Sequence, residues 1–225
     1  MTRFLASIKN IEEAKKVLFS NIDIIDFKNV NDGALGFVGV EIVNQGRKLL
    51  KDHVISVTMG NDLNPNNESL INNIKSVVKN KIEYIKIGMF DISMLHEHKN
   101  ILGKINFSST KPICVVFADH DFDLSLIQKI IDIGYKGVMI DTCHKDGKSI
   151  LDLINKDTIT KFVKIVKDNN VICGLSGSLK FHHIKELKHL DINFLGFRGE
   201  LCYKPTGRDF INISQVEKVS FEIKN

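Results

Sequence analysis

Short apolar segments alternate along the whole chain with longer segments in which apolar residues recur every three or four positions. The short segments are apolar almost throughout and rich in Ile, Val and Phe, as expected for parallel strands that are covered on both faces. They span residues 3–8, 22–29, 53–60, 84–90, 113–119, 137–143, 171–177 and 194–199. The pattern therefore predicts eight parallel strands.

The segments between these strands predict helices. They span residues 11–20, 38–50, 69–80, 93–102, 124–134, 150–154 with 159–169, 181–190 and 213–223. Apolar periodicity is weakest in residues 91–111, where we expect a short or irregular helix.

Strict alternation of strand and helix implies a parallel sheet. An open, doubly wound sheet of eight strands would also fit, but eight units with nothing left over favour closure into a (β/α)8 TIM barrel. The chain contains only three prolines and no interior linker or low-complexity segment. We therefore predict a single TIM-barrel domain over residues 1–225, a length that such barrels commonly have.

Composition and charge bear on the cellular compartment and exclude some classes of binding partner. The net charge of +4 is small and spread over helix faces, so it suits an anionic small molecule and not nucleic acid. No apolar run is long enough for a membrane span, and the N-terminus lacks the apolar stretch of a signal peptide. We expect a cytoplasmic protein without a membrane partner, and the oligomeric state, including a homo-oligomer, stays open.

The cysteines and histidines do not form a recognisable metal motif. Cys114, Cys143, Cys173 and Cys202 contain no CxxC pair, and three of them lie in apolar runs, as expected for small buried side chains in a reducing compartment. The pairs His96/His98 and His182/His183 have no partners at metal-site spacing. The sequence therefore predicts neither a metal site nor a cofactor.

Polar residues end nearly every apolar run. Catalytic groups of TIM barrels come from the carboxyl ends of the strands and the loops that follow. The residues at these positions are Ser7, Asp26, Lys28, Ser56, Thr58, Lys86, Asp119, Asp141, Lys145, Ser176, Ser178 and Arg198. Side chains two apart in a strand share a face, so Asp26 and Lys28 should face the barrel interior while Phe27 faces the helices.

The lysines in this set suggest imine chemistry. Lys86 lies between two isoleucines, where an ammonium group loses much of its hydration. Burial and neighbouring cations both lower the pKa of an amine, and a neutral amine can attack a carbonyl to form a Schiff base. Asp26 and Asp141 could hold the remaining ammonium groups and transfer protons. The alternative is that the same residues form structural ion pairs, Asp26 with one lysine and Asp141 with another.

Two glycine clusters predict a phosphate site. The sequences GLSGS (174–178) and GFRG (196–199) end the seventh and eighth strands, where these barrels frequently bind phosphate. Gly177 and Gly199 allow backbone N–H groups to approach an anion, Ser178 and Arg198 can donate hydrogen bonds, and the next helix N-terminus would add its dipole. Tight turns also need glycine, so each cluster alone is weak evidence. A second contact could come from Lys204 or Arg208.

Several motifs together resemble one known family. They are IDIIDFKNVNDGALG (22–36), VTMG (57–60), YIKIG (84–88), VVFAD (115–119), MIDTCHKDGKSILD (139–152), LSGSL (175–179) and LGFRGELC (195–202). These motifs are similar to those of the (5-formylfuran-3-yl)methyl phosphate synthase family, also called 4-(hydroxymethyl)-2-furancarboxaldehyde-phosphate synthase. The resemblance covers residues 4 to about 209, and DxKN together with DTxxKDGK is its most specific part.

The resemblance implies a TIM-barrel lyase that condenses two molecules of glyceraldehyde 3-phosphate into a phosphorylated furan aldehyde, with loss of phosphate and water. The product is the furan precursor of methanofuran and of a related bacterial cofactor. By resemblance, Lys28 forms the Schiff base, Lys86 accepts a proton, and Asp26, Asp141 and Lys145 match further active-site positions.

The chain departs from the family pattern in its loops. Val30 replaces a proline, and GFVGVEIV (36–43) replaces a GANFPW-containing loop. Two other functions stay open on the residues alone. One is a class I aldolase or isomerase of another phosphosugar, and the other is a non-catalytic barrel that binds a phosphorylated metabolite.

Overall fold

Eight strands form one closed barrel in the computed structural model, which describes residues 1–120 and 122–225. The strands are β1 (Arg3–Ile8), β2 (Ile24–Phe27), β3 (Ile55–Thr58), β4 (Tyr84–Gly88), β5 (Lys111–Phe117), β6 (Gly137–Asp141), β7 (Ile172–Leu175) and β8 (Phe194–Phe197). Each strand pairs in parallel with the next, and β8 pairs with β1 to complete the circle. The predicted TIM barrel is confirmed.

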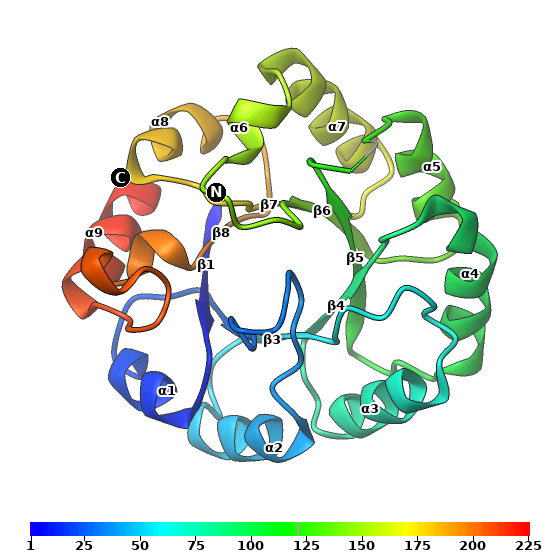
Figure 1. Ribbon diagram of the computed structural model, residues 1–225, viewed down its shortest axis with the longest axis horizontal. Helices are drawn as coiled ribbons and strands as arrows, with labels where there is room; N and C mark the ends of the chain where they lie inside the picture. Colours follow the sequence, from blue (N-terminus) through cyan, green and yellow to red (C-terminus); the bar gives the residue numbers. More distant parts are fainter. Residues whose placement is uncertain (121) are drawn as a thin grey trace.

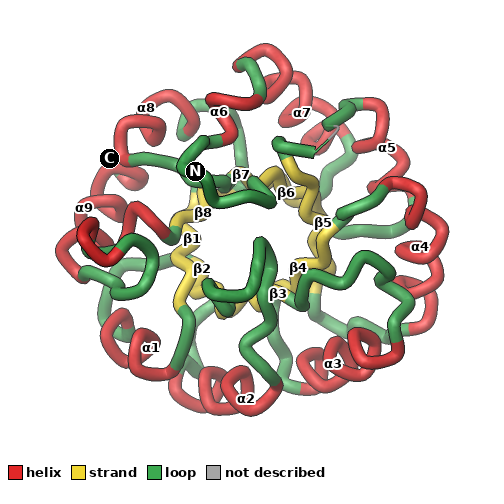
Figure 2. Tube along the Cα trace, viewed as in Figure 1, coloured by secondary structure: helices red, strands yellow, loops and turns green. Residues whose placement is uncertain are grey.

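Helices surround the barrel as an outer ring (Figure 1), and the tube in Figure 2 shows the strands in yellow enclosed by helices in red. The α-helices are α1 (Ile11–Val17), α2 (Val40–Leu49), α3 (Glu68–Lys79), α4 (Leu95–Lys104), α5 (Ser125–Asp132), α6 (Ile150–Leu153), α7 (Lys156–Asp168), α8 (Ile184–Leu187) and α9 (Ile213–Lys224). Four 3-10 turns are η1 (Ile92–Met94), η2 (Phe181–His183), η3 (Gly199–Leu201) and η4 (Lys204–Thr206). No helix in the described part of the chain combines the length and the apolar character needed to cross a membrane.

Asparagine side chains begin four of the helices. Asn10, Asn67, Asn155 and Asn212 each accept a hydrogen bond from a backbone N–H in the first turn of α1, α3, α7 and α9 respectively. Such caps satisfy N–H groups that have no partner within the helix. The local sequence therefore sets where these helices begin.

Apolar side chains fill much of the barrel interior, so that the barrel is a packed core and not a pore. This inner cluster contains Leu5, Ile24, Tyr84, Ile113, Val115, Phe117, Met139 and Phe194. A larger cluster packs between the outside of the barrel and the helices. Phe27 belongs to the outer cluster, and its ring lies against Gly46 of α2, where an added Cβ would be 2.4 Å from the ring. The predicted alternation around Phe27 is therefore confirmed.

The loop between β2 and α2 folds into the mouth of the barrel. Leu35 is only 1% exposed and belongs to the inner cluster together with Ala34. The loop is held by the next one, because the Leu35 N–H donates to Asn61 Oδ1 at 2.8 Å and the Gly60 N–H donates to the Leu35 carbonyl at 2.9 Å. The hydroxyl of Thr58 donates to the Gly36 carbonyl at 2.7 Å. This inserted loop closes part of the mouth.

The expectation for residues 91–111 is wrong. The structure has a 3-10 turn, η1, followed by the regular ten-residue helix α4. Its buried face contains Ile101 and a histidine, His98, whose Nδ1 lies 2.6 Å from the Tyr135 hydroxyl. Because a polar residue occupies a core position, the apolar periodicity of this helix is weak in the sequence.

The helix expected over residues 181–190 is also much shorter than predicted. The structure has the 3-10 turn η2 and then α8, which has four residues. The chain after β8 likewise continues into η3 and η4 and not directly into a helix. The predicted dipole of a following helix therefore does not contribute to a phosphate site at β7 or β8.

Candidate active site

One buried ion pair lies between the ends of β2 and β4. The Lys86 Nζ lies 2.7 Å from Asp26 Oδ1, and both side chains are almost completely buried. The hydroxyl of Ser7, at the end of β1, donates to Asp26 Oδ2 at 2.8 Å. Neighbouring strand ends thus fix the Asp26 carboxylate, which in turn fixes the Lys86 amine.

A second carboxylate, Asp141 at the end of β6, contacts two amines. The Lys145 Nζ lies 3.0 Å from Asp141 Oδ1, and the Lys28 Nζ lies 3.8 Å from Asp141 Oδ2. Lys145 also donates to the carbonyl and the hydroxyl of Thr142. All three protons of the Lys145 ammonium group therefore have acceptors, whereas Lys28 has one long contact. This difference leaves the Lys28 amine less stabilised as a cation.

Burial lowers the pKa of Lys28 to about 7, and the positive charges of Lys145, Lys86 and Arg208 act in the same direction against the opposing charge of Asp141. Burial alone would raise the pKa of Asp141, but Lys145 and Lys28 and a hydrogen bond with Ser176 hold it well below its usual range. At neutral pH the pocket thus holds an ionised Asp141 and a substantial fraction of neutral Lys28 amine, as a nucleophile requires.

These contacts include the ion pairs of the structural alternative, Asp26 with Lys86 and Asp141 with Lys28 and Lys145. Four of these five residues also line one cavity of about 280 Å³ at the carboxyl ends of the strands. They are Lys28, Lys86, Asp141 and Lys145. A structural pair needs no cavity beside it, so the geometry favours a functional role for this set.

The loop after β7 forms the next wall of this cavity. Gly177 and Ser178 line it, and both have left-handed backbone conformations, with φ of 92° and 50°. A Cβ on Gly177 would lie 2.5 Å from Ile150 Cγ2 and 2.9 Å from the Thr142 N atom. Only glycine lets this loop approach the β6 loop so closely. The structure therefore places both residues beside the segment that carries Asp141.

Arg198 needs a correction as a phosphate-binding side chain. It lines the cavity with Gly199, but its guanidinium group forms two hydrogen bonds to Glu13, at 2.6 and 3.0 Å. Its other N–H groups donate to the carbonyls of Ser7, Arg208 and Asp209. Because every donor is engaged, Arg198 holds the loop after β8 in place and has no free N–H group for an anion.

Arg208 takes the place expected for Arg198. It lines the cavity together with Lys180 and Lys204, and its guanidinium group has no hydrogen bond to any side chain that the structure describes. Sequence analysis named Arg208 only as a second contact and did not identify Glu13. The sequence around Glu13, IEEAKK, is typical of a solvated helix face, so no local signal marks it as a partner of Arg198.

A cluster of two histidines and a cysteine lies at the mouth, and sequence analysis did not identify it. One potential ligand atom from each of His120, Cys143 and His144 lies within 4.8 Å of the others. Cys143 and His144 are adjacent, but His120 lies 23 positions before Cys143, so the three residues form no short sequence motif. Cys143 also differs from the three buried cysteines, because it is partly exposed.

The sequence profile of the 4-HFC-P synthase family matches residues 4–220. The chain is 28% identical over 211 residues to (5-formylfuran-3-yl)methyl phosphate synthase of Methanocaldococcus jannaschii, covering 88% of this chain and 89% of the relative. It is 30% identical over 211 residues to the synthase of the same name of Methanococcus aeolicus, with the same coverage.

Solved structures show the same fold at low sequence identity. KGPDC from Streptococcus mutans has a TM-score of 0.67 and 16% identity, covering all of this chain and 98% of the other. A 3-hexulose-6-phosphate synthase has a TM-score of 0.66 and 12% identity, covering 98% and 99% of the two chains. The likeness to these barrels extends to the fold, while the sequence match covers nearly the whole chain and includes the strand ends that form the cavity. The chain therefore belongs to the 4-HFC-P synthase family.

Proposed function

We propose that this chain condenses two molecules of glyceraldehyde 3-phosphate into (5-formylfuran-3-yl)methyl phosphate through an imine on Lys28. The observation that carries the proposal is a buried amine whose pKa is lowered to about 7, inside a basic cavity of a barrel related to synthases of that product. Family membership supports the overall reaction, and the geometry of the lysines supports the route.

The first step uses the neutral amine of Lys28. It attacks the aldehyde carbon of one triose phosphate, and water leaves as the imine forms. The iminium carbon withdraws electrons and acidifies the adjacent C–H bond. The Lys86–Asp26 pair, which holds its amine and carboxylate 2.7 Å apart, takes up the proton: when the shared proton rests on Asp26, Lys86 is a neutral base. The product of this step is an enamine.

The second step joins the two trioses. The enamine carbon adds to the aldehyde of the second molecule, and the new alkoxide receives a proton. The ionised Asp141 and the charged Lys145, 3.0 Å apart, then assist dehydration and ring closure by moving protons to and from the departing oxygens. In ring closure a hydroxyl oxygen of the second triose bonds to the imine carbon and the Lys28 amine leaves, which breaks the C–N bond and restores the free lysine. Over the whole cycle, mass balance requires the loss of one phosphate and two molecules of water for each furan formed.

The phosphate groups would hold both trioses in the cavity. The backbone around Gly177, Ser178 and Gly199 and the side chain of Arg208 line the same cavity as the lysines. Backbone N–H groups, a hydroxyl and a guanidinium group all donate to phosphate oxygens. Holding two aldehydes beside one amine makes carbon–carbon bond formation effectively unimolecular.

Borohydride trapping tests the imine. The protein is incubated with glyceraldehyde 3-phosphate, reduced with borohydride and mapped by peptide mass spectrometry. We expect one reduced triose adduct on Lys28, no adduct in Lys28→Met, and an adduct without furan formation in Lys86→Met. An adduct on another lysine, or none at all in protein that forms furan, would show that the imine route is wrong.

Product analysis tests the reaction itself. The condensation should release inorganic phosphate and a furan that absorbs in the near ultraviolet. A condensed or isomerised sugar phosphate without released phosphate would instead indicate a class I aldolase or isomerase.

A further inference from the structure

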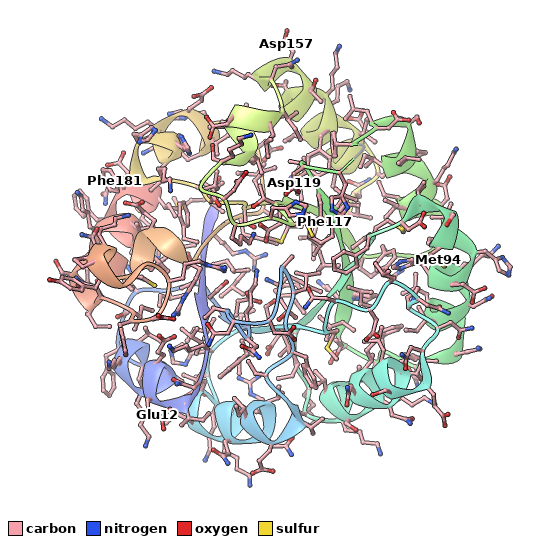
Figure 3. The ribbon with its side chains drawn as sticks, in the orientation of Figure 1. Glu12, Met94, Phe117, Asp119, Asp157 and Phe181 are labelled. Atoms are coloured by element: carbon pink, nitrogen blue, oxygen red, sulfur yellow. The ribbon has the colours of Figure 1, made fainter. Side chains whose placement is uncertain are left out.

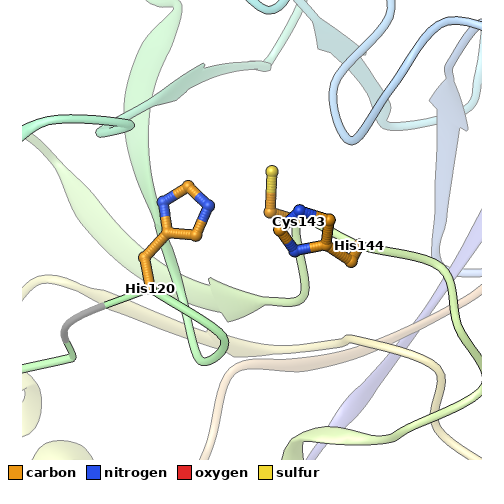
Figure 4. Close-up of side chains that lie close together, drawn as sticks. All are labelled: His120, Cys143 and His144. Carbon is orange, nitrogen blue, oxygen red and sulfur yellow. The ribbon is translucent and has the colours of Figure 1, made fainter.

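Three side chains with metal-binding atoms converge from two neighbouring loops at the mouth of the barrel. His120 follows β5, and Cys143 and His144 follow β6 (Figure 4). One ligand atom of each lies within 4.8 Å of the other two. A tetrahedral zinc ion with two nitrogen ligands and one sulfur ligand needs these atoms about 3.4–3.6 Å apart. Small side-chain rotations are therefore enough to close the set around one ion.

Asp119 holds two of the three residues in this arrangement. Its carboxylate accepts hydrogen bonds from the backbone N–H groups of Cys143 and His144, both at 2.7 Å, and lies 3.0 Å from Nδ1 of His144. Metal-binding histidines commonly bond through their second nitrogen to such a carboxylate, which leaves Nε2 of His144 for an ion.

The third residue is also fixed, and the site is open to solvent. The ring of His120 packs against Phe117 with ring centroids 5.4 Å apart, and its centroid lies 6.0 Å from that of His144. Figure 3 shows Phe117 and Asp119 inside the ring of helices, with Met94 and Asp157 farther out. The His144 side chain is 69% exposed, so an ion can enter from water and keep a water molecule as a fourth ligand.

We propose that His120, Cys143 and His144 bind a borderline divalent transition-metal ion, with zinc as its representative, that ties the loop after β5 to the loop after β6. One thiolate and two imidazoles are ligands that zinc prefers over the oxygen-seeking magnesium and calcium ions. Cys143 lies two residues from both Asp141 and Lys145, so a bound ion would also restrain the segment that carries these two active-site groups. The proposal does not depend on the reaction assigned above.

Metal titration of the whole chain tests the site. Chelator-treated, reduced protein is titrated with Zn²⁺ by calorimetry and with Co²⁺ by absorption spectroscopy. We expect one ion per chain, and for Co²⁺ a thiolate-to-metal charge-transfer band with the intense visible bands of tetrahedral coordination. Cys143→Ser should remove the charge-transfer band. Asp119→Asn, which leaves the ligands in place, should weaken Zn²⁺ binding by about 10–100-fold.

His182→Ala is the matched control, because His182 is an exposed histidine in η2, outside the proposed ligand set, and it should leave the affinity unchanged. Alkylating the Cys143 thiol of the wild-type protein tests the same metal site without a substitution. Cys143 is the accessible thiol, and the other three cysteines are buried. Circular dichroism checks that each variant is folded. The proposal is overturned if no stoichiometric binding occurs, if the charge-transfer band survives loss of the Cys143 thiol, or if His182→Ala weakens binding as much as Asp119→Asn.

Discussion

Lys28 and Lys145 share one carboxylate, yet their surroundings give them different chemistry. Lys145 donates to Asp141 and twice to Thr142, whereas the Lys28 amine has one polar contact among the described residues, with Asp141 at 3.8 Å. Hydrogen bonds to an ammonium group favour its charged form, and burial without such bonds favours the neutral amine. The same carboxylate therefore serves one fixed cation and one nucleophile.

The pH dependence of imine formation follows from the lowered pKa of Lys28. The amine is neutral above a pH of about 7 and protonated below it, so kcat/KM and the rate of borohydride trapping should rise as the pH rises through that value. Asp141 opposes the shift, so Asp141→Asn should move this rising limb to lower pH. Stopped trapping reactions across a pH series measure both curves. A limb centred near the pKa of a solvent-exposed lysine, or one moved to higher pH by the substitution, contradicts the assignment.

Most residues of this site could be predicted from the sequence, but the ion pairs that they form could not. Strand ends and alternation identify Lys28, Lys86 and Asp141 because inward-facing polar groups in apolar runs stand out. Asp26 and Lys28 are close in sequence, but they join different ion pairs, because each reaches across the barrel to another strand. Partners on distant strands depend on register and side-chain packing, which local patterns do not contain.

At the scale of elements, Arg198 connects the end of β8 to α1. Its two hydrogen bonds to the buried Glu13 carboxylate join residues 185 positions apart. The same guanidinium group binds the carbonyls of Arg208 and Asp209 in the following loop. One side chain thus sets where that loop, with Arg208, meets the cavity.

Removing the carboxylate from this link should loosen the loop. Glu13→Ala leaves a buried guanidinium group without its counter-ion and should lower the free energy of unfolding by about 3–5 kcal/mol. It should also raise KM more than it lowers kcat, because Arg208 loses its position while the lysines keep theirs. Denaturant unfolding and steady-state kinetics measure the two effects.

Glu12→Ala is the matched control, since Glu12 is exposed in the same helix turn, on the outer ring in Figure 3. Its effect on stability should stay within about 0.5 kcal/mol. Equal effects of the two substitutions would show that the Arg198 link has no special role.

The elements that sequence analysis misjudged share a physical cause. α4 places His98 in the core, where its Nδ1 lies 2.6 Å from the Tyr135 hydroxyl, so a polar residue occupies a buried position. η2 and α8 occupy a stretch whose pattern, FHHIKELKHL, predicts one longer helix. In both places tertiary contacts decide the helix, and they are not encoded in its own periodicity.

At the scale of the whole molecule, positive charge is concentrated on the cavity. Its lining contains seven basic residues, Lys28, Lys86, Lys145, Lys180, Lys204, Arg198 and Arg208, against two acidic ones, Asp141 and Glu200. The net charge of the chain is only +4, so the cavity is more basic than the molecule as a whole. Such a concentration attracts anionic substrates from solution.

Salt should therefore weaken substrate capture more than chemistry. Raising the ionic strength from low to about 0.15 M shortens the Debye length to about 8 Å and should raise KM for a triose phosphate while kcat changes little. Initial rates at several salt concentrations measure this. Glyceraldehyde without phosphate is the control substrate and should show little salt dependence; equal dependence for both aldehydes would mean that the charge acts elsewhere.

The barrel as a whole was the most predictable feature, because eight repeated units leave few other closed arrangements. The inserted loop between β2 and α2 was not, since Ala34 and Leu35 lie between glycines in a segment without periodicity. Their burial arises from contacts with Asn61 and Gly60 in the next loop.

That loop fills part of the barrel mouth beside the cavity. Among the described residues, the cavity takes its lining from β1, β2, β4, β6, β7 and β8 with their loops, and Leu35 fills the opposite side of the mouth. In the proposed condensation, both aldehydes occupy this cavity, one at Lys28 and the other beside it. Position in the cavity then distinguishes the carbonyl that becomes the imine from the one that is attacked, although the two molecules are chemically identical.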